Sequence, residues 1–362
     1  MDTIEHDHEF RMTPELDPLP SWADRYARPD LQPWSGRVDS LDDYGAFRWH
    51  QWIQPLDLSR ATEAFAGRLG IALLGFCSDE GIRRNLGRPG AVQGPRSIRK
   101  ELSNLPCWFS DELKLFDAGD LHCADGDLEG AQAALAGAVA RLLELGYFPV
   151  VLGGGHETAY GHFRGLRAHL GRAPAIVNFD AHFDLRPYPG GGTSGTMFRQ
   201  IADDCAAAAE PYAYLCLGVQ RYGNTVDLFR TADRLGVQYV LSKDLAGMPL
   251  ARLQAILAAF AAGRDHLYVT ICADVFSSAF APGVSASQPL GMDPEQAFQA
   301  LMGLFRTGKV RGFDVCEVSP RFDQDSTTAN LAKVLVFSAV RALAQVHGLS
   351  LGEEGAPISA AR

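Results

Sequence analysis

Short apolar runs alternate with amphipathic stretches along most of the chain after residue 70. The apolar runs are predicted to be strands, at 71–76, 113–120, 148–152, 175–179, 213–219, 237–242, 266–271 and 310–315. The stretches between them have apolar residues at helical spacing and predict helices at 95–105, 127–146, 158–171, 250–263, 294–308 and 327–346. Runs that are apolar on both faces suit strands buried in a parallel sheet. The alternation therefore predicts a three-layer α/β fold with a mostly parallel central sheet.

The two ends of the chain lack this alternation. Residues 1–60 are rich in proline, tryptophan and aspartate, and we expect them to form an irregular arm on the surface of one large domain. The domain is expected to cover residues 61–350, and residues 351–362 are expected to form a C-terminal tail.

Composition narrows the class of protein. The chain has 362 residues, of which 47% are hydrophobic, so it can bury a core without disulfide or metal staples. Its formal net charge of −10 argues against nucleic acid or an anionic membrane surface as the partner. The first residues are polar and acidic, which does not resemble a secretory signal, and no apolar stretch is long enough to span a membrane. Seven scattered cysteines without a CxxC pair indicate reduced thiols and a cytoplasmic protein.

Polar side chains follow four of the predicted strands. They lie in the segments GGGHE (153–157), DAHFD (180–184), CAD (272–274) and CEVSP (316–320). In an open parallel sheet, ligands bind beyond the carboxyl ends of the strands. We therefore expect these four segments to meet at one edge of the sheet.

The segment 180–184 suggests a metal site. Asp180, His182 and Asp184 occupy alternate positions, so in an extended chain they can point the same way. Two carboxylates around an imidazole could hold two cations about 3.5 Å apart, with His156 and Asp274 completing the site. An oxygen-rich ligand set with two histidines suits Mn²⁺ better than structural Zn²⁺. The alternative, a solvated loop with a salt bridge, is disfavoured because burying these carboxylates without a cation costs several kcal/mol.

The four segments, in this order, resemble the ureohydrolase superfamily of arginase, agmatinase and formimidoylglutamase. The resemblance runs from about residue 70 to 345 and implies an arginase-like α/β/α fold with two Mn²⁺ ions. Residues 78–99, 193–202 and 317–333 resemble formimidoylglutamase in particular. That resemblance implies hydrolysis of the linear amidine C–N bond of N-formimidoyl-L-glutamate, a small-molecule substrate of histidine degradation, to L-glutamate and formamide. It is also compatible with a homo-oligomer.

The resemblance assigns roles to individual residues. One metal ion would be held by His156, Asp180 and Asp184, and the other by Asp180, His182 and Asp274, with position 272 bridging both. Asp184 would also hold the attacking water and transfer its proton. Glu317 would attract the cationic amidine.

Cys272 departs from the family pattern, which has an aspartate at this position. A thiolate is a soft ligand, whereas Mn²⁺ prefers oxygen. Cys272 could bridge the two ions as a thiolate, stand aside and leave one tight and one weak metal site, or change the metal preference. We expect the second outcome, because nothing else in the ligand set is soft.

The other end of the substrate carries two carboxylates, which require cations. Arg84, Arg88 and Arg199 are candidates for bidentate contacts, and Asn85 and Thr196 for hydrogen bonds. Surface arginines are common, so each could equally be structural. Three further histidines are expected to be structural: His162, His169 and His266.

Three alternative functions are open at this stage. A ureohydrolase acting on a guanidino acid, like guanidinobutyrase or agmatinase, would use the same metal site. A catalytically impaired homologue with an altered metal site would retain the fold without the activity. A nucleotide-binding oxidoreductase is disfavoured, because LGGGHE lacks the G-x-G-x-x-G spacing of a dinucleotide site.

Overall fold

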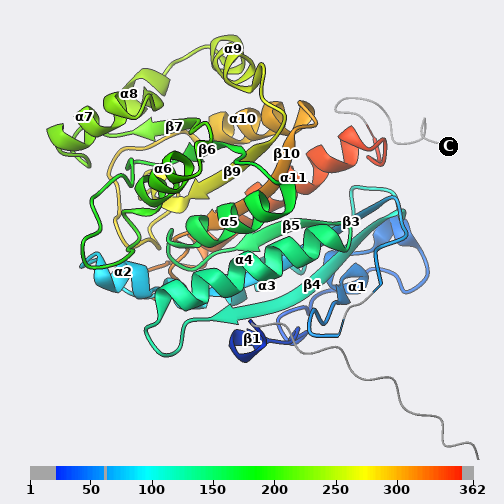
Figure 1. Cartoon of the computed structure of the whole chain (residues 1–362). Coiled ribbons are helices and arrows are strands. Elements are labelled where there is room, and N and C mark those ends of the chain that lie inside the picture. Colours follow the sequence, from blue (N-terminus) through cyan, green and yellow to red (C-terminus); the bar gives the residue numbers. More distant parts are fainter. Residues whose placement is uncertain (1–21, 61–62, 353–362) are drawn as a thin grey trace, which may run out of the picture.

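The computed structural model describes residues 22–60 and 63–352, and its centre is one ten-stranded sheet (Figure 1). The strands are β1 (Tyr26–Ala27), β2 (Gln54–Pro55), β3 (Leu69–Cys77), β4 (Leu113–His122), β5 (Tyr147–Leu152), β6 (Ala175–Phe179), β7 (Tyr214–Val219), β8 (Gln238–Leu241), β9 (Leu267–Cys272) and β10 (Val310–Cys316). Their order is β1-β4-β3-β5-β10-β9-β6-β7-β8, with β2 also paired to β4. Only β1 is antiparallel to its neighbour, which confirms the predicted mostly parallel sheet.

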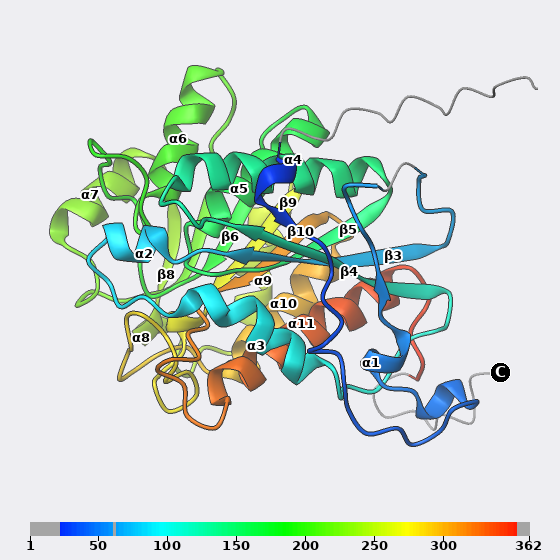
Figure 2. The same cartoon turned by 90° about the horizontal axis from the view of Figure 1, so that it is seen from below.

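Helices cover both faces of the sheet. They are α1 (Trp49–Trp52), α2 (Glu80–Arg84), α3 (Gly94–Leu102), α4 (Leu128–Glu144), α5 (Thr158–Leu170), α6 (Met197–Ala207), α7 (Val226–Arg234), α8 (Ser242–Leu245), α9 (Leu250–Ala261), α10 (Pro294–Arg306) and α11 (Thr327–Val346). Figure 2 shows the strands between α4 and α5 on one side and α3, α10 and α11 on the other. Buried apolar residues form one cluster on each face, so the three-layer prediction is confirmed.

The eight predicted strands and six predicted helices are present, with ends shifted by a few residues. Helices α1, α2, α6, α7 and α8 were not predicted, and neither were the two-residue strands β1 and β2. α2 and α8 are too short to show a helical period. α7 does carry a start signal that could have been used, because the side chain of Thr225 accepts a hydrogen bond from the Leu228 backbone N–H.

Helix α11 is long and apolar enough to cross a membrane, judged by length and composition alone. Its 20 residues pass a length and hydropathy test for a membrane-spanning helix, but 56% of the window is buried inside the protein. It packs against α3 and α10 and contributes to the core, through residues such as Val336 and Val340. Burial of this kind explains its apolar character as that of a core helix.

The described part of the first 60 residues runs along β4. β1 and β2 both pair with β4, and Trp49 is completely buried. The indole N–H of Trp34 donates a hydrogen bond to Asp117 Oδ2 at 2.6 Å. The expected C-terminal tail, apart from residues 351 and 352, and the first third of the expected arm lie outside the described residues.

Candidate metal centre

Four neighbouring strands, β5, β10, β9 and β6, bring the four polar segments to one edge of the sheet. His156 follows β5, Glu317 follows β10, Cys272 ends β9 and Asp180 follows β6. All four strands are parallel, so their carboxyl ends lie together, as the sequence predicted.

His156 contacts two carboxylates of the segment 180–184. Its Nδ1 lies 2.9 Å from Asp180 Oδ2 and 3.2 Å from Asp184 Oδ2. All three side chains are buried. The structure therefore brings together the three residues expected to hold the first metal ion.

The second expected group is also assembled. His182 Nδ1 lies 3.1 Å from Asp274 Oδ2 and 3.5 Å from Asp180 Oδ1. One potential ligand atom from each of these residues lies within 4.8 Å of the others. Asp180 thus belongs to both groups, one oxygen facing His156 and the other His182.

The segment 180–184 is not extended, contrary to the expectation from its alternation. β6 ends at Phe179, the chain bends at residues 181 and 182, and Asp184 has a φ of 50° in the left-handed region. A non-glycine residue in that region costs roughly 1–2 kcal/mol. The turn, rather than strand alternation, is what directs Asp184 back to His156.

Cys272 lies inside the cluster. Its side chain is 2% exposed, and its sulfur, His156 and Asp180 offer ligand atoms within 4.8 Å of one another. Burial, and then the negative charge of Asp180, raise the pKa of the thiol well above its usual value. The thiol therefore stands where a bridging ligand is expected but is protonated when no metal is bound.

Glu317 reaches the same cluster from β10. Its Oε1 accepts a hydrogen bond from the backbone N–H of His156 at 3.1 Å, and its own φ is 69°. Burial raises the pKa of Glu317 to about 7, and the nearby charge of Asp274 adds to this. Its second oxygen, Oε2, is buried without a hydrogen-bond partner among the described residues.

The glycines of segment 153–157 allow the strand ends to approach closely. A Cβ on Gly154 would lie 1.8 Å from the carbonyl oxygen of Ser78, so no other residue fits there. A Cβ on Gly155 would lie 2.0 Å from Glu157 Oε2. The buried carboxyl of Glu157 therefore occupies the space beside Gly155.

A chain of buried hydrogen bonds supports His156 from behind. His156 Nε2 lies 3.0 Å from Thr270 Oγ1, and the Thr270 hydroxyl donates to Asp314 Oδ1 at 2.5 Å. Asp314 Oδ2 in turn accepts from the Tyr268 hydroxyl at 2.5 Å and lies 2.6 Å from His162 Nδ1. A hydrogen bond from Nε2–H leaves the lone pair of His156 Nδ1 directed at the metal position. His162 was expected to be structural, and in the structure it forms this buried contact with Asp314.

We expect Thr270→Val to weaken binding of the metal ion at His156 by about 10- to 100-fold, because the imidazole loses the partner that fixes its tautomer. The measurement is a Mn²⁺ titration of the metal-free protein. Thr307→Val is the control, since the hydroxyl of Thr307 caps α10 and lies at the other end of the sheet. Unchanged affinity in Thr270→Val would show that this network does not position His156.

The residues expected to bind the substrate lie in two adjacent segments. A Cβ on Gly195 would lie 3.1 Å from the Asn85 side chain, so the start of α6, with Thr196, is beside the end of α2. Arg84 is already paired with Glu80 and Glu129.

Arg88 and Arg199 also have partners within the chain. Arg88 donates to the carbonyl oxygens of residues 284 and 285, and Arg199 pairs with Asp203 on the same helix. Of the three expected arginines, only Arg88 has no carboxylate within 4 Å in the described part of the chain.

Arg186 is a further candidate for substrate binding that was not predicted from the sequence. It is exposed, it follows Asp184 by two residues, and its Nη1 donates to Asn85 Oδ1 at 3.1 Å. Among residues 22–60 and 63–352, no carboxylate pairs with it. Its position two residues after a candidate ligand was the available signal.

The cluster fits a pair of divalent cations. Asp274 Oδ1 is buried without a hydrogen-bond partner among the described residues, and such an atom is costly unless a cation satisfies it. Burial and the charge of Asp180 raise the pKa of Asp184 to about 6, so these carboxyls repel one another without a counter-charge. Two ligand groups that share Asp180 support a dinuclear metal site.

Comparison with known proteins agrees with this geometry. Residues 69–341 match the sequence model of the arginase family. A formimidoylglutamase of Clostridium tetani is 51% identical over 325 residues, which cover 88% of this chain and 96% of that protein. A formimidoylglutamase of Chromobacterium violaceum is 46% identical over 316 residues, covering 87% and 99%.

Solved structures show the same fold. The crystal structure of Trypanosoma cruzi formiminoglutamase with Mn²⁺ has a TM-score of 0.69 and 25% identity, and the match covers 76% of this chain and 94% of that one. The formimidoylglutamase of Bacillus subtilis has a TM-score of 0.72 at 23% identity, covering 86% and 97%. From its fold, its metal-binding cluster and these relatives, the chain belongs to the arginase family.

Proposed function

We propose that this protein hydrolyses N-formimidoyl-L-glutamate to L-glutamate and formamide, using two Mn²⁺ ions held by His156, Asp180, His182, Asp184 and Asp274. One observation carries the metal part of the proposal: Asp180 takes part in both ligand groups at the edge of the sheet. The choice of substrate rests on the curated relatives named formimidoylglutamase, which are 38–51% identical to this chain.

In the proposed reaction, water adds to the formimidoyl carbon, and the bond from that carbon to the glutamate nitrogen breaks. When bound, the metal pair supplies Lewis acidity that lowers the pKa of the attacking water far below its bulk value of about 15.7. Asp184 accepts a proton from that water and returns it to the leaving nitrogen.

Glu317 provides the charge that recognises the amidine. Its Oε2 is buried and lacks a hydrogen-bond partner among the described residues, and a cationic amidine N–H would satisfy it. Its backbone is held in place by a hydrogen bond to Gly154 O at 2.7 Å. The left-handed φ of Glu317 is a strained backbone conformation, which contacts such as this hydrogen bond maintain.

The two carboxylates of the substrate would lie toward α2 and the start of α6. We assign this end to Arg88 and Arg186, which have no carboxylate partner among residues 22–60 and 63–352, with Asn85 and Thr196 as hydrogen-bonding groups. Arg84 and Arg199 would contribute only if the substrate displaced their present partners.

We further propose that residues 61–350 form the catalytic domain and that the protein acts in the cytoplasm. The seven cysteines all lie within the described residues, and none is in a disulfide. Free thiols are typical of a reducing compartment.

The test is turnover of N-formimidoyl-L-glutamate by the full-length protein with and without Mn²⁺, measured as formamide and glutamate released. We expect Mn²⁺-dependent release of both products in equal amounts. Urea release from guanidinobutyrate or agmatine would favour the guanidino-acid alternative. No turnover of any amidine with both metal sites filled would favour the catalytically impaired homologue.

The thiol of Cys272 is expected to lower the affinity of the protein for the second metal ion. Cys272→Asp would replace a protonated thiol with a carboxylate and should tighten the weaker Mn²⁺ site, as read from a Mn²⁺ binding isotherm of the metal-free protein. Cys272→Ser is the control. It replaces the thiol without adding a carboxylate, so the weaker site should keep its low affinity for Mn²⁺. Equal affinities in wild type and Cys272→Asp would contradict this account of Cys272.

A further inference from the structure

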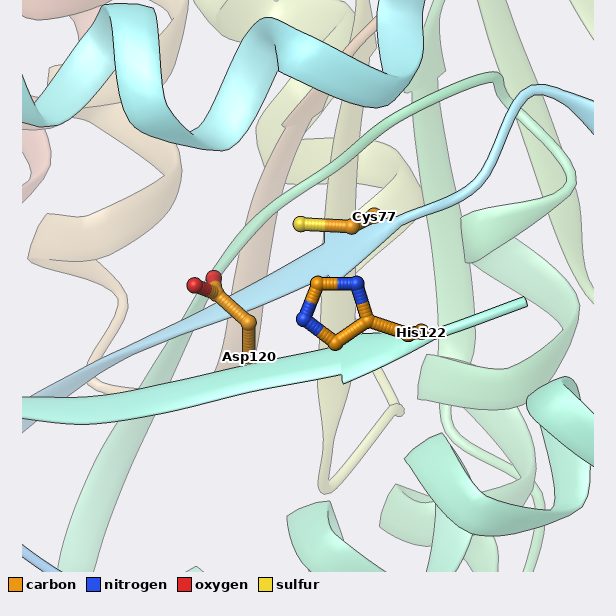
Figure 3. A group of neighbouring side chains, drawn as sticks. All are labelled: Cys77, Asp120 and His122. Carbon is orange, nitrogen blue, oxygen red and sulfur yellow. The ribbon is translucent and has the colours of Figure 1, made fainter. Parts of the chain in front are cut away.

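A second group of metal-ligand side chains lies at the same edge of the sheet, where β3 and β4 end. Cys77, Asp120 and His122 each offer a ligand atom within 4.8 Å of the others. Figure 3 shows the sulfur, the carboxylate and one ring nitrogen facing a common space. β3 lies next to β5, and His156 follows β5, so this group is separate from the metal centre but on the same edge.

The pairing of the two strands creates this arrangement. Cys77 is in register with His122, and Gly75 with Asp120, in the parallel ladder between β3 and β4. Asp120 and His122 are two residues apart on one strand, so their side chains project on the same side. A Cβ on Gly75 would lie 1.8 Å from Asp120 Oδ1, so only glycine leaves room for this carboxylate over β3.

A buried arginine holds Asp120 in place and sets the local charge. Arg99 Nη1 lies 2.6 Å from Asp120 Oδ1, and Arg99 Nε lies 2.9 Å from Asp117 Oδ2. Two carboxylates against one guanidinium leave a single negative charge. Loss of the Cys77 proton would add a second, and a divalent cation would neutralise both.

The space at this group is accessible to an ion and its water ligands. Neither Cys77 nor Asp120 is buried, and His122 reaches the surface. The three side chains line a cavity of about 190 Å³, together with residues such as Gln93 and Arg96. Burial raises the pKa of the Cys77 thiol, and the negative charge of Asp120 adds to this, so a bound metal ion would have to displace the thiol proton.

We propose that Cys77, Asp120 and His122 bind one Zn²⁺ ion, with water as the fourth ligand. Thiolate, imidazole and carboxylate are the ligands that Zn²⁺ takes in proteins, and three of them with one open position are sufficient. Mn²⁺ prefers a site without a thiolate, so the two kinds of ion separate between the two centres. Binding releases the Cys77 proton to solvent.

The ion would fasten the end of β3 to β4 beside the metal centre. Cys77 immediately precedes Ser78, whose carbonyl oxygen accepts a hydrogen bond from Gly155 N at 2.8 Å. Gly155 in turn precedes His156. The proposed site is therefore one residue from the contact that supports the turn carrying a ligand of the dinuclear centre.

The test is a Zn²⁺ titration of the full-length, Mn²⁺-saturated protein against a chromophoric chelator. We expect one zinc ion to bind to the wild type and to Cys123→Ser, a neighbouring half-buried cysteine outside the group. Cys77→Ser and His122→Ala should weaken this binding by at least about tenfold. Cys272→Ser should retain it, which separates this site from zinc captured at the dinuclear centre.

A second measurement needs no variant. Zn²⁺ should slow alkylation of Cys77 in the wild-type protein, followed by peptide mass spectrometry, while alkylation of Cys123 stays unchanged. The proposal is overturned if Cys77→Ser and His122→Ala bind zinc as the wild type does. It is equally overturned if Zn²⁺ leaves the alkylation rate of Cys77 unchanged.

Discussion

Asp180→Asn is expected to reduce kcat/KM for N-formimidoyl-L-glutamate by about three orders of magnitude, or about 4 kcal/mol of transition-state stabilisation. Asp180 is a carboxylate that contacts both His156 and His182. An amide in its place carries no negative charge and offers one oxygen instead of two. Both metal sites should weaken together, so the measurement pairs steady-state kinetics with bound Mn²⁺ determined after dialysis.

Asp204→Asn is the matched control for Asp180→Asn. Asp204 lies on α6 and accepts a hydrogen bond from the Tyr160 hydroxyl, with no part in the ligand groups. This variant should keep both manganese ions and the wild-type kcat/KM. If Asp180→Asn retained both ions and full activity, the shared carboxylate would not be a metal ligand.

Glu317→Gln is expected to reduce kcat/KM by about 10²- to 10³-fold while bound Mn²⁺ stays at the wild-type amount. The substitution keeps the shape of the side chain, and the amide oxygen can still accept from the His156 backbone N–H. It removes the negative charge that would face the cationic amidine. The measurement is kcat/KM together with metal content, because a ligand residue would lower both and a substrate-binding residue only the first.

Glu210→Gln provides the comparison for Glu317→Gln. Glu210 is partly buried and pairs with Arg167, and no part of it belongs to the metal centre. It should keep wild-type kinetics. Loss of manganese from Glu317→Gln would instead assign Glu317 to the metal ligands, and unchanged kcat/KM would remove it from substrate recognition.

The sheet was predictable because its strands are short runs of apolar residues. β5, β6, β9 and β10 are buried on both faces, so their sequences are mostly apolar up to the strand ends. The buried polar exceptions are Asn178, Thr270 and Asp314. That same change from apolar to polar marks the edge of the sheet where the ligands lie. Helix α2 was not predicted because it has only five residues, which is fewer than two helical turns and too short to show a helical period.

Most of the candidate metal centre was also visible in the sequence, but its local geometry was not. The two-residue spacing of Asp180, His182 and Asp184 suggested an extended segment. In the structure this segment turns, and the positive φ of Asp184 directs its carboxylate to His156. Nothing in the residue types signals a left-handed aspartate, because tertiary contacts impose it.

The support behind His156 could not be predicted at all. Thr270 and Asp314 look like ordinary polar residues inside apolar strands, and His162 like one more polar residue on a helix. Their hydrogen bonds depend on β9 and β10 pairing in the observed register, with Thr270 opposite Asp314, and on α5 lying over them. Such long-range pairing is set by the fold and leaves no local pattern in the sequence.

The most direct test of the metal centre is a crystal structure of the Mn²⁺-loaded protein with anomalous scattering recorded at the manganese edge. Two peaks are predicted, one among His156, Asp180 and Asp184 and one among Asp180, His182 and Asp274, with one of the two at lower occupancy. No peak within this cluster, with manganese bound elsewhere or not at all, would contradict the account.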